Sequence, residues 1–285
     1  MNWPSGTLLA QSALSGVFIG GLYGLLGLGL GLTWGLLHVI NLAHFGLAFL
    51  AAYLCYQLAG SGGVDPLATL VLIVPLFFAL GVAMHWLLVR FRVSPLNSLL
   101  ATFGITAIIE AGIQAVWTAD FRKLESTYAA QKLRIGELFV PIPELVTLSL
   151  AIALSFAIWA AMRYTDLGKA MRAVAEDGPM AAAFGVDHRR LALLLSGVCG
   201  ALAGIAGVCL ALSFTLTPAQ IYAWVGVVFA AVMLGGLGSP LGPLAAGIII
   251  GVSEALTAAV ASPSWSPIVS FTLLIVLLVA RPGKP

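Results

Sequence analysis

Two acidic side chains stand inside long apolar stretches of the sequence. Glu110, with Gln114 on the same helical face, and Glu254 are both surrounded by aliphatic residues. Placing a carboxylate in lipid costs about 2.5–3.5 kcal/mol on insertion scales, so such a residue is a candidate for a functional site. The chemistry would be contact with a polar solute or transfer of a proton. Alternatively, each carboxylate is a satisfied hydrogen-bonding group between helices, or lies near the end of a span.

A second polar group, Asn41 and His44, interrupts the apolar sequence near the N-terminus. Both lie in segment 33–46, which indicates a short turn or an unwound stretch at the edge of a bilayer. Their side chains could bind a solute, or they could satisfy backbone groups that unwinding leaves free, and we favour the second role. Together with Glu110 and Glu254 they form the candidate translocation path.

Motifs that mark enzymes elsewhere predict no catalytic, cofactor or metal site here. No Lys-Ser/Thr pair follows Gly235–Gly238 and no strand precedes it, so it predicts a membrane turn and not a phosphate cradle. Gly251–Ser253 matches only three letters of a serine-hydrolase motif. Cys55, Cys199 and Cys209 lie in apolar runs without metal-ligand spacing, which predicts packing residues. We therefore expect a chain that is not an enzyme and has no ATPase site of its own.

The composition requires a membrane environment. Of 285 residues, 61% are hydrophobic and 8% are charged, which leaves too little polar surface for a water-soluble globule. Backbone groups in lipid must be hydrogen-bonded internally, and the alternating segments of a β-barrel are not visible. We therefore expect an all-α, polytopic transmembrane helical bundle embedded in the lipid bilayer. The net charge of +2 is too small to indicate a nucleic-acid partner.

Turn signals divide the chain, taken as one domain over 1–285, into eight or nine spans. Closely spaced glycines in the first run predict that helices approach each other closely there. Residues 119–143 carry mixed charges and predict an exposed loop. The number of spans depends on the first segment, because a re-entrant first helix would remove one. The apolar runs cover 8–32, 43–58, 67–89, 97–118, 144–162, 191–216, 221–234, 241–260 and 268–280.

The longest polar interruption of the second half, 163–190, has the pattern of two short helices. Residues 167–177 are good helix formers, and Gly178-Pro179 ends that helix and places proline at the start of the next. Gly185 can close the second helix in a left-handed cap, and Asp187 can cap the following span. On these features alone, a plain basic loop is an open alternative.

The distribution of basic residues predicts the orientation. If loop 163–190 is cytoplasmic, its five basic residues share that side with Arg90, Arg92, Arg281 and Lys284, which makes nine inside against four outside. This agrees with the positive-inside rule and places the C-terminus in the cytoplasm.

Several motifs stand in the same order as in a known family. They are spread over nearly the whole chain: Asn41–Gly46, Leu99–Ile105, Gly168–Asp177 followed by Ala181–Gly185, Ala230–Ser239, and Gly251–Glu254. In this pattern the sequence resembles the permeases of ABC importers that move branched-chain amino acids.

The resemblance implies a permease subunit of an ATP-driven importer in the bacterial inner membrane. It would form the translocation path with a second permease, either a paralogue or another copy of itself. Two cytoplasmic ATP-binding subunits would dock on the coupling loop 163–190, and a periplasmic binding protein would deliver the solute. The docking residues implied are Lys169, Arg172, Ala173, Glu176, Asp177, Met180, Phe184 and Gly185.

Two departures from the family pattern leave the solute open. Segment 224–229 lacks a lysine that the family often has there, and Phe45 separates His44 from Gly46. A branched-chain amino acid, urea, an amide or an aromatic acid all remain possible solutes. The alternative class is an ion- or proton-coupled secondary transporter with Glu110, Glu254 and the histidines as a relay, and a third is a nonselective channel.

Overall fold

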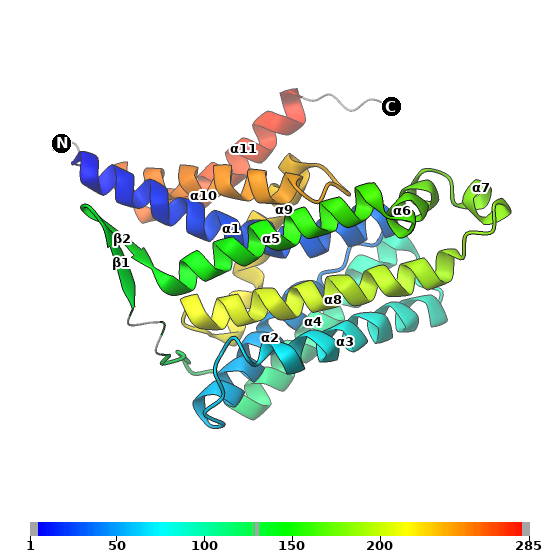
Figure 1. The fold of residues 1–285 in the computed structure, drawn as a ribbon, viewed down its shortest axis with the longest axis horizontal. Helices are drawn as coiled ribbons and strands as arrows, with labels where there is room; N and C mark the ends of the chain where they lie inside the picture. Colours follow the sequence, from blue (N-terminus) through cyan, green and yellow to red (C-terminus); the bar gives the residue numbers. More distant parts are fainter. Residues whose placement is uncertain (1–4, 127, 129–130, 281–285) are drawn as a thin grey trace.

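The computed structural model describes residues 5–126, 128 and 131–280, and most of them are helical (Figure 1). In chain order the elements are α1 (Gly6–Leu37), α2 (Ala43–Gly60), α3 (Leu70–Arg90), α4 (Pro95–Trp117), β1 (Lys132–Ile135), β2 (Leu138–Pro141), α5 (Ile142–Tyr164), α6 (Asp166–Glu176), α7 (Gly178–Ala183), α8 (His188–Ser213), η1 (Pro218–Gln220), α9 (Ile221–Gly235), α10 (Gly242–Val260), η2 (Pro263–Trp265) and α11 (Ser266–Ala280).

Within these residues, eight helices are long and apolar enough to cross a bilayer. They are α1 to α5, α8, α9 taken together with η1, and α10. At the position of the ninth apolar run, α11 is a shorter apolar helix. The all-α polytopic bundle expected from the sequence is confirmed.

Helix α1 is one continuous helix and not a re-entrant segment. It extends five residues beyond the expected boundary at Leu32 and ends at Leu37, where His38 adopts a left-handed conformation with φ 56°. The backbone N–H of His38 donates to the carbonyls of Thr33 and Trp34, which satisfies the end of the helix. The break before α2 is therefore short, and His44 already belongs to the first turn of α2.

Glycines bring α1 and α10 into direct backbone contact. A Cβ atom at Gly16 would lie 2.6 Å from the Gly251 carbonyl oxygen, and one at Gly20 would lie 2.5 Å from that of Gly247. Gly24 continues the same row against Leu244. The four-residue spacing places all three glycines of α1 on one face, so α1 and α10 pack as closely as the glycines in the sequence predicted.

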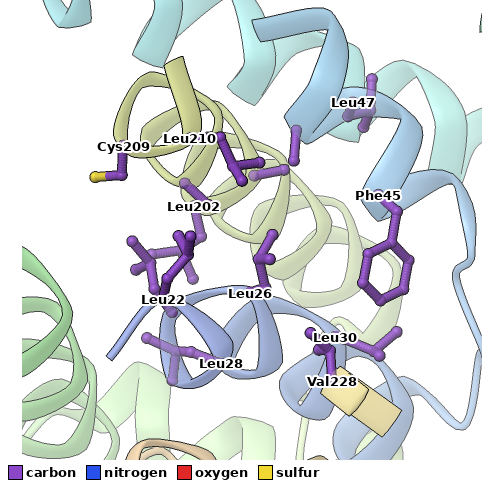
Figure 2. Close-up of a cluster of buried hydrophobic side chains, with 14 of the residues drawn as sticks. Leu22, Leu26, Leu28, Leu30, Phe45, Leu47, Leu202, Cys209, Leu210 and Val228 are labelled. Carbon is purple, nitrogen blue, oxygen red and sulfur yellow. The ribbon is translucent and has the colours of Figure 1, made fainter. Parts of the chain in front are cut away.

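The buried core surrounds α1. Figure 2 shows Leu22, Leu26 and Leu30 of α1 facing Leu202 of α8 and Phe45 of α2. The three cysteines are also buried and form no disulfide, as expected for packing residues. In contrast, α3, α4 and α5 carry long exposed apolar faces, which is the surface that lipid or another membrane protein would cover.

The predicted loop 119–143 contains a β-hairpin that the sequence did not indicate. Strands β1 and β2 pair antiparallel, with Leu133 opposite Val140. The side chain of Gln11 holds this hairpin to α1, since its Nε2 donates to the Phe139 carbonyl and its Oε1 accepts from the Phe139 N–H, both at 2.9 Å. The side-chain amide of Gln11 thus pairs with the backbone of β2 as a residue of a neighbouring strand would.

A hydrogen bond ties together two loops outside the bundle. The Tyr128 hydroxyl donates to the Asp65 carboxylate at 2.7 Å. This bond, with help from the backbone N–H groups of Leu67 and Ala68, holds the pKa of Asp65 below its usual range.

The two ends of the bundle differ. The start of α1 and the hairpin lie at one end, here called the hairpin end, and α6 and α7 lie at the opposite end (Figure 1). Helix α10 runs antiparallel to α1, so its second half lies beside the first half of α1. The cavity and the loop described next therefore lie at opposite ends of the molecule.

Candidate functional site

A cavity with a volume of about 620 Å³ lies toward the hairpin end of the bundle. This volume is within the range of small-molecule sites. Its walls come from the first half of α1, the start of α5, the end of α8, the start of α9, the second half of α10 and the start of α11. These segments are far apart in sequence, so the site exists only when the whole bundle is assembled.

Glu254 is one of two carboxylates that line this cavity. Its two oxygens accept hydrogen bonds from different hydroxyls, with the Tyr23 O–H donating at 2.9 Å and Ser270 donating to the other oxygen. The hydroxyl of Ser266 donates to the backbone carbonyl of Glu254. Helices α1, α10 and α11 therefore meet at this side chain.

The Tyr23 ring is itself fixed by aromatic contacts. It packs edge-on against Trp224 at 5.7 Å between ring centroids, and Trp224 packs edge-on against Phe214 at 5.3 Å. A rigid ring holds its hydroxyl at a fixed position, so Glu254 is oriented by a neighbour that cannot easily turn away.

Glu144 and Tyr222 complete the polar part of the cavity. Glu144 lies in the first turn of α5, is partly buried and interacts electrostatically with Lys132 of the hairpin. Tyr222 lies on α9 and also contacts the carboxylate of Glu110 on α4. The structure thus gives Glu110 and Glu254 different partners, since Glu110 also accepts a hydrogen bond from Gln114 at 3.2 Å.

Asn41 and His44 lie elsewhere, where α1 leads into α2. His44 is 1% exposed, its ring is packed against Gly29, and it interacts with the Leu26 carbonyl. Within the described residues, the Nε2 of His44 and the Oδ1 of Asn41 are buried without a hydrogen-bond partner. The four candidate path residues are therefore not gathered in one place.

Loop 163–190 forms the two short helices that the sequence indicated. The Thr165 hydroxyl caps α6, and the Asp177 carboxylate caps α7 by accepting from the Met180 N–H at 3.0 Å. Gly185 ends α7 with φ 85°, a conformation that suits glycine. Asp187 caps α8 by accepting from the Arg190 N–H at 3.1 Å.

Helix α6 is seated directly on the end of α5. A Cβ at Gly168 would collide with the backbone of Met162 and Ala161, so only glycine permits this approach. Both Gly168 and Met162 are buried. The loop is therefore packed against the bundle.

The side chains that the loop presents outward are those singled out in the sequence. Phe184 is 83% exposed and Met180 is 57% exposed, which is unusual for large apolar residues outside a lipid environment. Two ion pairs cross the surface, from Lys169 to Asp166 and from Arg190 to Asp187. All eight residues of the predicted dock are exposed: Lys169, Arg172, Ala173, Glu176, Asp177, Met180, Phe184 and Gly185.

The predicted charge partition places Arg90 and the loop 163–190 on the same side of the membrane. Arg90, at the end of α3, and the basic residues of loop 163–190 belong to the same end of the bundle. Arg281 and Lys284 lie outside the described residues.

Comparison with known proteins assigns the chain to a family. The model of the family described as "Branched-chain amino acid transport system / permease component" matches residues 12–278. The chain belongs to this family. No solved structure matches this permease.

Relatives of this permease match nearly the whole chain. The high-affinity branched-chain amino acid transport system permease protein LivH of Salmonella typhimurium LT2 is 28% identical over an alignment of 298 positions, which covers 96% of each chain. LivH of Escherichia coli K12 is 27% identical and BraD of Pseudomonas aeruginosa is 24% identical, with the same coverage. The resemblance inferred from the motifs is confirmed.

Several residues of the site of this permease were not found from the sequence. Tyr23 and Ser270 carried no signal, because a single hydroxyl in an apolar run is common and its partner is distant in the chain. Glu144 stood at the start of an apolar run, where a charge is usual. Gly168 belonged to a recognised motif, but its close contact with α5 can be seen only in the fold.

Proposed function

We propose that this permease is the transmembrane subunit of an ATP-driven importer for branched-chain or related amino acids. Family membership over residues 12–278 and the multi-pass helical bundle support this function. In this proposal a second permease completes the translocation path. Two cytoplasmic ATP-binding subunits supply the energy, and a periplasmic binding protein delivers the solute.

The observation that carries the proposal is the seating of α6 and α7 between two membrane-spanning helices. The loop is fixed to α5 through Gly168 and continues into α8 through the Asp187 cap, yet its outer face has no partner within the described chain. A rigid element of this kind can pass a rigid-body displacement from a docked protein into the bundle. A flexible loop would absorb the same displacement.

The orientation follows from the same proposal. The ATP-binding subunits are cytoplasmic, so α6 and α7 face the cytoplasm and the hairpin end faces the periplasm of the bacterial inner membrane. The excess of basic residues in the loop supports this orientation.

The decisive test removes two exposed side chains that form no ion pair within the part of the chain that the structure describes. Glu176 and Arg172 are exposed and make no ion pair within the described residues, whereas Asp177 caps α7. We expect Arg172→Ala with Glu176→Ala to lower ATP-dependent uptake about tenfold or more, because hot-spot truncations typically cost about 2 kcal/mol of docking. The measurement is solute uptake by proteoliposomes that contain the assembled transporter and the binding protein.

A control in the same loop separates loss of docking from loss of folding. Arg189→Ala removes an exposed charge of the same loop outside the predicted dock. Wild-type uptake in the double variant would contradict the dock, and uptake driven by an ion gradient without ATP would support the secondary transporter instead.

A further inference from the structure

The charged groups that line the large cavity all have the same sign. Among its described lining residues are two carboxylates, Glu144 and Glu254, and no lysine, arginine or histidine. The remaining polar groups are hydroxyls, and most of the wall is aliphatic or aromatic. A cavity in low-dielectric surroundings with negative charges only attracts cations and repels anions.

Glu254 has hydrogen-bonding capacity left for a ligand. An ionised carboxylate offers about four acceptor positions on its two oxygens. Tyr23 donates a hydrogen bond to one oxygen and Ser270 donates to the other, so one acceptor position on each oxygen remains open. Because both neighbours are donors, the group that fits the open positions is an additional donor such as an ammonium.

Apolar side chains surround this acceptor. Phe18 and Leu22 of α1 and Phe271 of α11 line the same cavity as Glu254. A solute with an ammonium group and a short aliphatic body could satisfy both parts of the wall at once. A carboxylate on the solute, in contrast, would find no basic partner among the described lining residues.

We propose that this cavity is a vestibule that selects solutes by charge, in which Glu254 binds the ammonium group and the apolar wall holds the aliphatic part. Glu144, in the first turn of α5, adds a second negative charge near the hairpin end, which nearby Lys132 offsets in part. The nature of the solute rests on the proposed import function, but the charge preference of the cavity does not. Solutes with net negative charge are disfavoured in this cavity.

The test measures the charge preference directly with thiol reagents. Ala258 lines the cavity one helical turn from Glu254, so a cysteine there reports on the field of that carboxylate. The native cysteines are buried, so the chain without the added cysteine serves as the background control. The probes are trimethylammonium-ethyl, sulfonato-ethyl and methyl methanethiosulfonate, which are cationic, anionic and neutral, applied to the assembled transporter in nanodiscs without nucleotide.

We expect the ratio of cationic to anionic modification rates in the Ala258→Cys variant to exceed the same ratio at a control position about tenfold, a difference that one unit charge at short range produces. The matched control is Thr7→Cys, an exposed position at the start of α1 outside the cavity. Adding Glu254→Gln should move the ratio at position 258 toward that at position 7, and Glu144→Gln should lower it to a smaller extent.

Three outcomes would overturn the proposal. They are a ratio at position 258 no higher than at position 7, a ratio that Glu254→Gln leaves unchanged, or a cysteine at 258 that even the neutral reagent cannot reach. Should Glu254→Gln fail to fold, the ratio in the chain that keeps Glu254 still decides the first and third. Modification requires neither ATP nor uptake, so failure of the import function and failure of the vestibule can be told apart.

Discussion

His44 is a residue whose position is set by a single glycine. Its ring fills the space over Gly29, where a Cβ atom would overlap the ring itself. We expect Gly29→Ala to destabilise the protein by about 1–3 kcal/mol, because a buried ring must leave its place in a packed core. Thermal unfolding of the purified protein, followed by intrinsic fluorescence, measures the change.

The control is Gly104→Ala, in the interior of α4. No atom lies within 4 Å of a Cβ there, so the substitution adds a better helix former without a clash. We expect a neutral or slightly stabilising effect. Equal melting temperatures for the two variants would contradict the role of Gly29 as a seat for His44.

At the scale of residues, the sequence identified unusual side chains but not their partners. Glu254 stood out because a carboxylate is rare in an apolar run, and this property is local. Its partner Tyr23 lies 231 positions away, and only the packing of α1 on α10 brings the two together. Asn41 and His44 were grouped with the carboxylates by polarity alone, and the fold places them in a different part of the bundle.

The contact between α1 and α10 shows how elements depend on the absence of side chains. We expect Gly20→Ala to destabilise the bundle by about 1–3 kcal/mol, because a Cβ would meet the backbone of Gly247 and Ile248, which cannot rotate away. The matched control on the same helix is Gly6→Ala, where no atom lies within 4 Å.

Chemical denaturation of both variants in the same detergent compares their unfolding midpoints. A lowered midpoint for Gly20→Ala only is the expected result. If the two variants unfold alike, the helices can separate without cost, and the glycine row is not the contact that holds them.

At the scale of elements, the features fixed by neighbours in sequence were predictable. The Asp187 cap of α8 depends on a residue next to the helix start and was predicted from the sequence, whereas the Thr165 cap of α6 and the Asp177 cap of α7 are equally local but were not predicted. The hairpin was missed because its two strands have four residues each and because Gln11, from a distant helix, fixes one edge. The end of α1 was placed too early because polar residues at the boundary resemble a turn.

For the whole molecule, the testable property is its orientation. Thr7 and Glu137 are exposed at the hairpin end, and Ala182 is exposed on α7 at the other end. We expect a membrane-impermeant thiol reagent to label Thr7→Cys and Glu137→Cys in intact cells, but Ala182→Cys only after the membrane is opened. This follows from the excess of basic residues around α7.

Labelling of Ala182→Cys alone in intact cells would indicate the opposite orientation. Labelling of all three cysteine variants would contradict a fixed topology. The native cysteines do not interfere, since all three are buried. The direction of the bundle stays a prediction from the distribution of basic residues. The location of the cavity could not be predicted from the sequence, since six helices contribute to its wall.

Helix α5 has a mechanical consequence that its position alone implies. It has 23 residues and joins the hairpin at one end to the seat of α6 at the other. At 1.5 Å per residue it is a stiff arm about 34 Å long, so a tilt of about 10° at one end displaces the other by about 6 Å. Glu144 lies at the end of α5 opposite the seat of α6. Small motions at the seat of α6 are therefore magnified where the cavity wall begins.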